Sequence, residues 1–104
     1  MMETIFTRTE WLLGKDRVRA LQEKSVVVFG CGGVGSFAIE ALVRTGIGRI
    51  IIVDGDKVTA SNINRQLIAL PATIGRRKVE AAGERILAIR PDIQLETWDI
   101  VYSE

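Results

Sequence analysis

Four glycines between positions 30 and 35 have the spacing of a phosphate-binding loop, in the run Gly-Cys-Gly-Gly-Val-Gly. The pattern lies between an apolar run and an amphipathic segment, where glycine lets the backbone approach a phosphate at a helix N-terminus. Asp54 ends the next apolar run, 19 residues after Gly35, where a carboxylate reaches a ribose hydroxyl. The loop and the acid together predict a nucleotide-binding site made from Gly30, Gly32, Gly33, Gly35 and Asp54.

Two groups of cations follow this loop. Arg76, Arg77 and Lys78 fall in the first turn of a predicted helix, where the positive end of the macrodipole disfavours basic side chains. Arg65 lies in a polar stretch just beyond the second apolar run. Cations aimed at a polyphosphate suit phosphoryl or adenylyl transfer, in which charge develops on phosphate oxygens. A solvated cationic turn is the alternative interpretation of residues 76–78, and a nicotinamide-dependent oxidoreductase also fits the glycine pattern.

Composition excludes several other classes of chemistry. The chain of 104 residues has no histidine and one cysteine, so it cannot build a Ser-His or Cys-His nucleophile, an internal disulfide or a cysteine-cluster zinc site. Cys31 fits a crowded turn by its small size. With 14 basic and 13 acidic residues, the net charge of +1 predicts no bulk attraction to nucleic acid or to anionic lipid.

The elements that must position these residues alternate between strand and helix. Apolar runs at 25–29, 50–53 and 93–98 predict strands, and amphipathic spacing predicts helices at 34–46 and 75–89. In the first of these helices Val34, Phe37, Ala38, Ala41 and Leu42 share the face expected to be buried, opposite Ser36, Glu40 and Arg44. In the second the inner face is formed by Val79, Ala82, Ile86 and Ile89.

This order predicts an α/β fold, a Rossmann-like three-layer α/β/α arrangement with a parallel sheet. We interpret it as incomplete, because β-α-β-α-β is one half of a doubly wound domain, and a small three-stranded domain is the alternative. We divide the chain into an N-terminal helical segment, 1–24, and a nucleotide-binding half-domain, 25–104, truncated at its C-terminus. The longest apolar runs have about four residues, far short of a ~20-residue membrane span. We therefore expect no membrane association and a cytoplasmic location.

Four further motifs carry a resemblance to a known family. They are residues 54–58 (Asp-Gly-Asp-Lys-Val), 61–66 (Ser-Asn-Ile-Asn-Arg-Gln), 74–80 (Ile-Gly-Arg-Arg-Lys-Val-Glu) and the opening 7–14 (Thr-Arg-Thr-Glu-Trp-Leu-Leu-Gly). With the glycine loop, they resemble the ubiquitin-activating-type adenylyltransferases, and the opening is closest to the branch of tRNA threonylcarbamoyladenosine dehydratases. The resemblance covers nearly all of the chain.

The resemblance implies ATP and Mg²⁺ as cofactors and a role for each matching residue. Asp54 would hold the ribose of ATP, with Asp56 in the same nucleotide-binding set, and the phosphates would be lined by Asn62, Arg65, Gln66 and Lys78. Arg8 matches an arginine finger inserted into a partner subunit, which implies a homodimer. The catalytic set is therefore Arg8, Arg65 and Lys78. The family's magnesium-binding aspartate lies downstream of residue 104.

The reaction implied is adenylation of a carboxylate by ATP, followed in the dehydratase branch by cyclisation of threonylcarbamoyladenosine in tRNA. Two alternatives remain open: adenylation of the C-terminus of a ubiquitin-like sulfur-carrier protein, and a nucleotide-binding fragment without turnover. One departure from the family is Gly55, where a larger residue is common, and we expect this glycine to loosen packing near the ribose.

Overall fold

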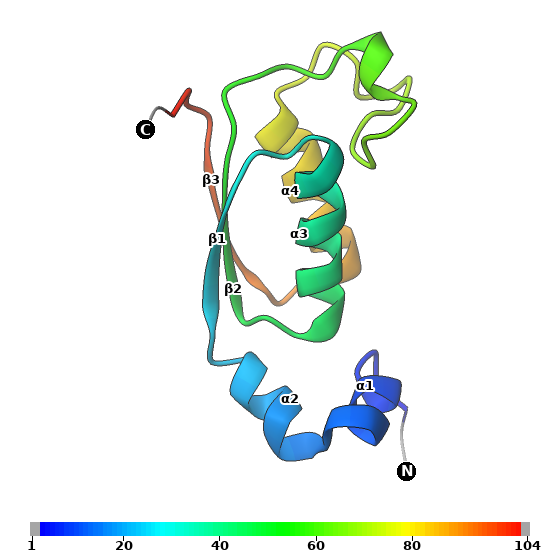
Figure 1. Cartoon of the computed structure of the whole chain (residues 1–104), viewed down its shortest axis with the longest axis vertical. Coiled ribbons are helices and arrows are strands. Elements are labelled where there is room, and N and C mark those ends of the chain that lie inside the picture. Colours follow the sequence, from blue (N-terminus) through cyan, green and yellow to red (C-terminus); the bar gives the residue numbers. More distant parts are fainter. Residues whose placement is uncertain (1–2, 103–104) are drawn as a thin grey trace.

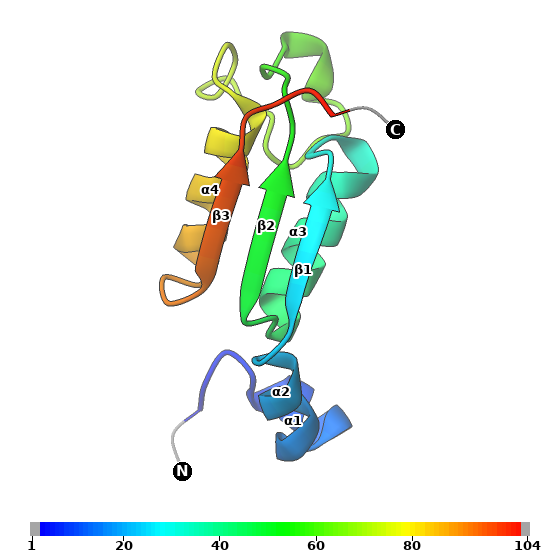
Figure 2. The same cartoon turned by 90° about the vertical axis from the view of Figure 1, so that its left-hand side faces the viewer.

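The computed structural model describes residues 3–102 and contains three parallel strands with helices (Figures 1 and 2). In chain order the elements are α1 (Thr7–Leu13), α2 (Lys15–Leu21), β1 (Ser25–Phe29), α3 (Gly33–Thr45), β2 (Arg49–Val53), the 3₁₀ turn η1 (Ala60–Asn62), α4 (Lys78–Ile89) and β3 (Gln94–Trp98). The strands lie in the order β1-β2-β3, with Ser25 beside Arg49 and Arg49 beside Gln94. The predicted α/β fold is confirmed.

The core lies between the sheet and the two long helices. Alternate residues of a strand point to opposite faces, so Ile50 and Ile52 of β2 both face α3 and α4 and are fully buried. Figure 1 shows both helices on this one face of the sheet. The described residues thus form the sheet and one helical layer of the expected arrangement. On the other face, Val27, Phe29 and Trp98 are exposed, and β1 is an edge strand.

The boundaries of the elements agree closely with the sequence pattern, with one shift. β1 spans the five predicted residues, and α3 ends before Gly46, whose φ of 123° suits glycine. α4 begins at Lys78 rather than at residue 75. Gly75 and Arg76 instead pair their backbones with Val58, so the chain reaches the helix through a turn at Gly75, whose φ is 88°, and a short antiparallel bridge between Lys57 and Arg77.

The predicted inner face of α3 is wrong. Ser36, Ile39 and Val43 are buried, whereas Val34 and Phe37 are 87% and 57% exposed. The helix carries two apolar stripes, and the direction in which it leaves β1 decides which stripe meets the sheet. The inner face of α4 is as expected, with Val79, Ala82 and Ile86 buried.

The N-terminal helices form an arm beside the strand starts, at the opposite end of the molecule from the glycine loop (Figures 1 and 2). α1 buries no residue and α2 buries only Val18. Phe6, just before α1, packs against the guanidinium of Arg90 at 5.1 Å and lies next to Gly46. Within residues 3–102, no helix has the length and apolar character needed to span a membrane.

Candidate nucleotide-binding site

The glycine loop turns sharply from β1 into α3. Gly30 has a φ of 98°, a conformation that favours glycine, and its N–H donates to the carbonyl of Val53 at 2.8 Å. A side chain at Gly35 would overlap the carbonyl oxygen of Gly30. These two glycines therefore make the turn possible, and the N-terminus of α3 is left facing the carboxyl ends of the strands, where ligands bind in such sheets.

Asp54 locks this loop to the end of β2. Its Oδ2 accepts a hydrogen bond of 2.9 Å from the N–H of Cys31, and its Oδ1 accepts one of 2.8 Å from the N–H of Asp56. The residue is 7% exposed. Both oxygens thus have backbone donors, a structural role that the strand-end pattern did not predict. Asp56 is the exposed carboxylate of the pair.

Arg65 and Gln66 cover the loop from the segment after η1. The Cδ of Arg65 lies 4.0 Å from the position of a Cβ on Gly33, and the Nε2 of Gln66 lies 3.5 Å from that on Gly32. The guanidinium of Arg65 donates to the carbonyl of Ser61 and to Asn64. Among residues 3–102 this guanidinium has no carboxylate partner. Within the same residues, the buried Oε1 of Gln66 receives no hydrogen bond.

Of the three cations at residues 76–78, only Lys78 remains without an acidic partner within the described chain. It is 8% exposed, at the first position of α4. Arg76 instead forms ion pairs of 3.0 and 2.8 Å with Glu80 and Glu84. Arg77 bonds elsewhere, to Asp99 and to the carbonyl of Gly55. The expectation that all three cations face a phosphate is therefore corrected for Arg76 and Arg77.

An open pocket of about 460 Å³ lies beside Lys78. It is lined by Gly55, Asp56, Lys57, Thr59, Asn62 and Lys78. Asn62 shapes its wall, since the Oδ1 accepts a 2.9 Å hydrogen bond from the N–H of Thr59 and so caps η1. The predicted residues Asp56, Asn62 and Lys78 thus share one pocket, and Arg65 and Gln66 lie over the neighbouring glycine loop.

Comparison with known proteins identifies this architecture. The sequence pattern of the ThiF family matches residues 7–100. The chain belongs to the ThiF family. It is 46% identical over 99 residues to the tRNA threonylcarbamoyladenosine dehydratase of Bacillus subtilis, covering 95% of this chain and 39% of that protein.

Two other ThiF relatives are informative. The Escherichia coli tRNA N6-threonylcarbamoyladenosine dehydratase, TcdA, in complex with ATP superposes with a TM-score of 0.91 and 40% identity, over 94% of this chain and 40% of that one. Ubiquitin-like modifier-activating enzyme 5 of Caenorhabditis elegans is 47% identical over 76 residues, 73% of this chain and 18% of that protein. The chain therefore spans about two fifths of the length of the dehydratases that it matches.

In this ThiF chain Gly55 does not loosen the packing, contrary to expectation. A Cβ at this position would lie 2.7 Å from the backbone nitrogen of Val101 and 2.8 Å from the carbonyl carbon of Ile100. The segment after β3 crosses directly over the glycine. The absence of a side chain is what allows this close crossing, which continues to Tyr102, whose ring meets Phe29 edge-on at 5.1 Å.

Cys31 has no nucleophilic character in this site. The side chain is fully buried, and burial, with the nearby Asp54 charge, raises the pKa of the thiol to about 12. The thiol is therefore protonated at neutral pH. This agrees with the predicted role of Cys31 as a small residue in a crowded turn.

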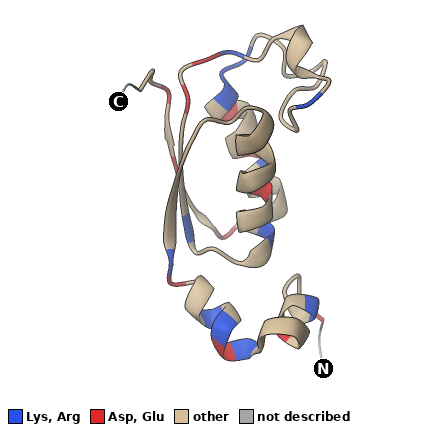
Figure 3. Cartoon of the chain, viewed as in Figure 1, with Lys and Arg blue, Asp and Glu red and all other residues tan. Residues whose placement is uncertain are grey.

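Arg8 lies in the arm, remote from the glycine loop of its own chain. Its guanidinium is over the ring of Trp11, 5.4 Å from the centroid. Figure 3 shows Lys and Arg both in the arm and around the start of α4, at opposite ends of the molecule. Within one described chain, therefore, Arg8 does not reach the pocket.

The residues around the glycine loop fit a phosphate-bearing ligand. The glycine cradle, the Nε2 of Gln66 beside Gly32 and the cations without carboxylate partners in the described chain supply an anion site. No group of three metal-ligating side chains occurs within residues 3–102.

Proposed function

We propose that this chain is the nucleotide-binding part of an ATP-dependent adenylating enzyme. The observation that carries the proposal is the side chain of Lys78, which is 8% exposed, lines the pocket and has no acidic partner within the described residues. Burying a charge without a counterion is costly, so a site that retains one suits an anionic ligand. A nucleotide polyphosphate at the adjacent N-terminus of α3 supplies that anion.

The roles of the other residues follow from their positions. Arg65 and Gln66, over Gly33 and Gly32, would contact phosphate oxygens together with Lys78. Asp54 would keep the loop in place and accept a ribose hydroxyl on its remaining lone pairs, with Asp56 beside it. Asn62 would line the same pocket. Hydride transfer to a nicotinamide does not require two such cations at the phosphates.

The chemistry proposed is attack of a carboxylate oxygen on the α-phosphorus of ATP, with pyrophosphate leaving. Lys78 and Arg65 would stabilise the negative charge that develops on the phosphate oxygens. The resulting mixed anhydride carries AMP as a good leaving group. In threonylcarbamoyladenosine, a neighbouring nitrogen or oxygen of the same molecule then attacks the activated carbonyl, closes a ring and releases AMP.

The similarity to dehydratases supports tRNA as the substrate, at 46% identity over nearly the whole chain. The ubiquitin-like modifier-activating relatives support the second candidate, adenylation of a carrier protein's C-terminus. A pyrophosphate-release assay distinguishes the two candidates. The full protein is incubated with ATP and either tRNA containing threonylcarbamoyladenosine or a carrier protein, and the true substrate is the one that supports release of pyrophosphate. A fragment without turnover would release it with neither.

A homodimer and a cytoplasmic location complete the proposal. Arg8 would act as a finger in the pocket of the partner subunit, because the arm lies too far from its own. Trp11 and Leu12 of α1 are exposed and available for such a contact. Sedimentation equilibrium should find a dimer, and a monomer at high concentration would remove the finger role.

The first test is calorimetric titration with ATP–Mg²⁺, with NADH as the competitor. We expect ATP to bind and NADH to leave its affinity unchanged. Preference for NADH would refute the adenylating function. Binding of neither nucleotide would refute a self-sufficient ATP site within these 104 residues.

A further inference from the structure

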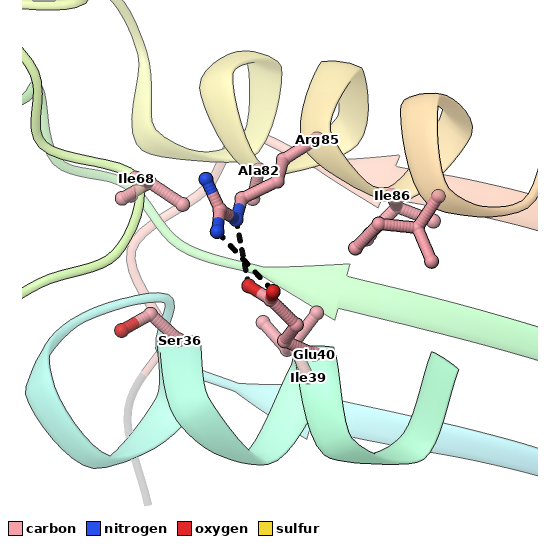
Figure 4. A pocket seen from close by; sticks show the side chains of 8 residues that line it. Ser36, Ile39, Glu40, Ile68, Ala82, Arg85 and Ile86 are labelled. Atoms are coloured by element: carbon pink, nitrogen blue, oxygen red, sulfur yellow. Dashed lines mark hydrogen bonds and ion pairs between the residues drawn. The ribbon is translucent and has the colours of Figure 1, made fainter. Parts of the chain in front are cut away.

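Ser36 is a buried hydroxyl with two backbone partners from different parts of the chain. It is 3% exposed, on the second turn of α3. Its Oγ donates to the carbonyl of Gly33 at 3.2 Å and accepts a hydrogen bond of 3.3 Å from the N–H of Leu67. Figure 4 shows Ser36 on α3 and Ile68 on the neighbouring segment, both lining the groove between α3 and α4.

These two partners belong to the two halves of the candidate phosphate site. Gly33 is part of the glycine loop, and Leu67 directly follows Arg65 and Gln66. The other hydrogen bonds of residues 59–74 are internal to that segment, apart from one that the N–H of Arg76 donates to the carbonyl of Thr73. Among the described residues, the bond from Leu67 to Ser36 is the one that joins this segment to α3.

Other contacts in the groove have a different role. Glu40, one turn further along α3, forms an ion pair of 2.6 Å with Arg85 of α4, drawn in Figure 4. Ile39 and Ile86 fill the space beside it. This pair joins helix to helix and touches neither the glycine loop nor Arg65. It provides a matched control for a change at Ser36.

We propose that Ser36 is a positioning residue that holds Arg65 and Gln66 over the glycine loop. The expected effect of Ser36 on ATP affinity rests on the proposed function. The expected effect on the attachment of residues 59–74 to α3 rests on the hydrogen bonds alone. Without the hydroxyl, the N–H of Leu67 loses its partner. The segment then detaches more often from α3, and the guanidinium of Arg65 is no longer held above Gly33.

The test compares wild type with Ser36→Ala, Ser36→Thr and the control Glu40→Gln. In the nucleotide-free protein, trypsin cleavage after Arg65, followed by mass spectrometry, should be about fivefold faster for Ser36→Ala, the effect of one net hydrogen bond. Ser36→Thr, which restores the hydroxyl, and Glu40→Gln should be cleaved there at the wild-type rate. Cleavage of Ser36→Ala at the wild-type rate, or equal acceleration in Glu40→Gln, would overturn the proposal.

Titration with ATP and with adenosine gives the second readout. Ser36→Ala should lower ATP affinity about fivefold and leave adenosine affinity unchanged, because only the phosphates reach Arg65 and Gln66. Equal losses for both ligands would indicate a general defect and overturn the positioning role. If wild type itself fails to bind ATP, the proposed function fails, whereas the cleavage rates still decide on Ser36.

Discussion

The carboxylate of Asp54 accepts a hydrogen bond of 2.9 Å from the backbone N–H of Cys31, 23 residues earlier in the chain. This bond ties the end of β2 to the glycine loop at the end of β1. Asp54 also accepts from the N–H of Asp56, so one side chain sets the position of both the loop and the pocket wall. We therefore expect nucleotide binding and stability to be coupled at this residue.

Asp54→Ala should lower the free energy of unfolding by about 1–3 kcal/mol, because the buried N–H of Cys31 and the part-buried N–H of Asp56 lose their acceptor. The same variant should lose ATP binding. Asp56→Ala, at an exposed carboxylate, should change stability by less than about 0.5 kcal/mol. Urea unfolding and calorimetry measure the two effects, and equal stability losses in both variants would contradict the locking role.

Lys78→Met should lower ATP affinity about tenfold or more while leaving the nucleotide-free protein as stable or more stable. Methionine keeps the buried apolar length and removes a charge that has no acidic partner in the described chain. Arg76→Met is the control, since Arg76 already pairs with Glu80 and Glu84. Thermal unfolding with and without ATP gives both quantities. A less stable nucleotide-free Lys78→Met protein would show that the ammonium is satisfied within the chain.

Gly55→Ala should destabilise the protein by about 1–3 kcal/mol, because its Cβ would meet the backbone of Ile100 and Val101. Gly33→Ala is the comparison, since its Cβ would approach only the Cδ of Arg65, at 4.0 Å. Alanine at that helical position should leave stability equal or higher. Urea unfolding measures the stability of both variants. A Gly55→Ala protein as stable as wild type would contradict the close crossing of the segment after β3 over Gly55.

Glu40 makes a pH-dependent contribution to stability. Hydrogen bonding from Arg85, and then from Arg44, lowers the pKa of its carboxyl below the ordinary 4.5. A lowered pKa in the folded state adds stability above pH 4.5 that is lost as the pH falls through the folded value. The difference in unfolding free energy between wild type and Glu40→Gln should thus be constant near neutral pH and shrink in acid. A difference that does not change with pH would contradict the ion pair.

Cys31 should resist alkylation in the folded protein. Burial and a pKa of about 12 leave almost no thiolate near pH 8. Iodoacetamide should therefore modify Cys31 only as fast as the protein unfolds, and urea should accelerate the reaction. Rapid labelling under native conditions, followed by mass spectrometry, would show that the loop opens.

Local spacing was enough to predict the fold class and the position of the candidate site. The strand at 25–29 and the helix end before Gly46 follow from a β-branched run and a C-capping glycine, which act over a few residues. The glycine loop, Asp54 and Lys78 then meet at one edge because parallel strands place their carboxyl ends together.

The tertiary structure alone decided which side chains are free to bind and which are engaged. Arg76 and Lys78 are two residues apart and read alike in the sequence, yet one pairs with glutamates on α4 and the other is buried beside the pocket. The buried face of α3 depends on how the chain leaves β1. The functions of Asp54 and Ser36 depend on backbone donors that are 23 and 31 residues away. Such contacts are set by packing between elements, which residue spacing along one segment does not encode.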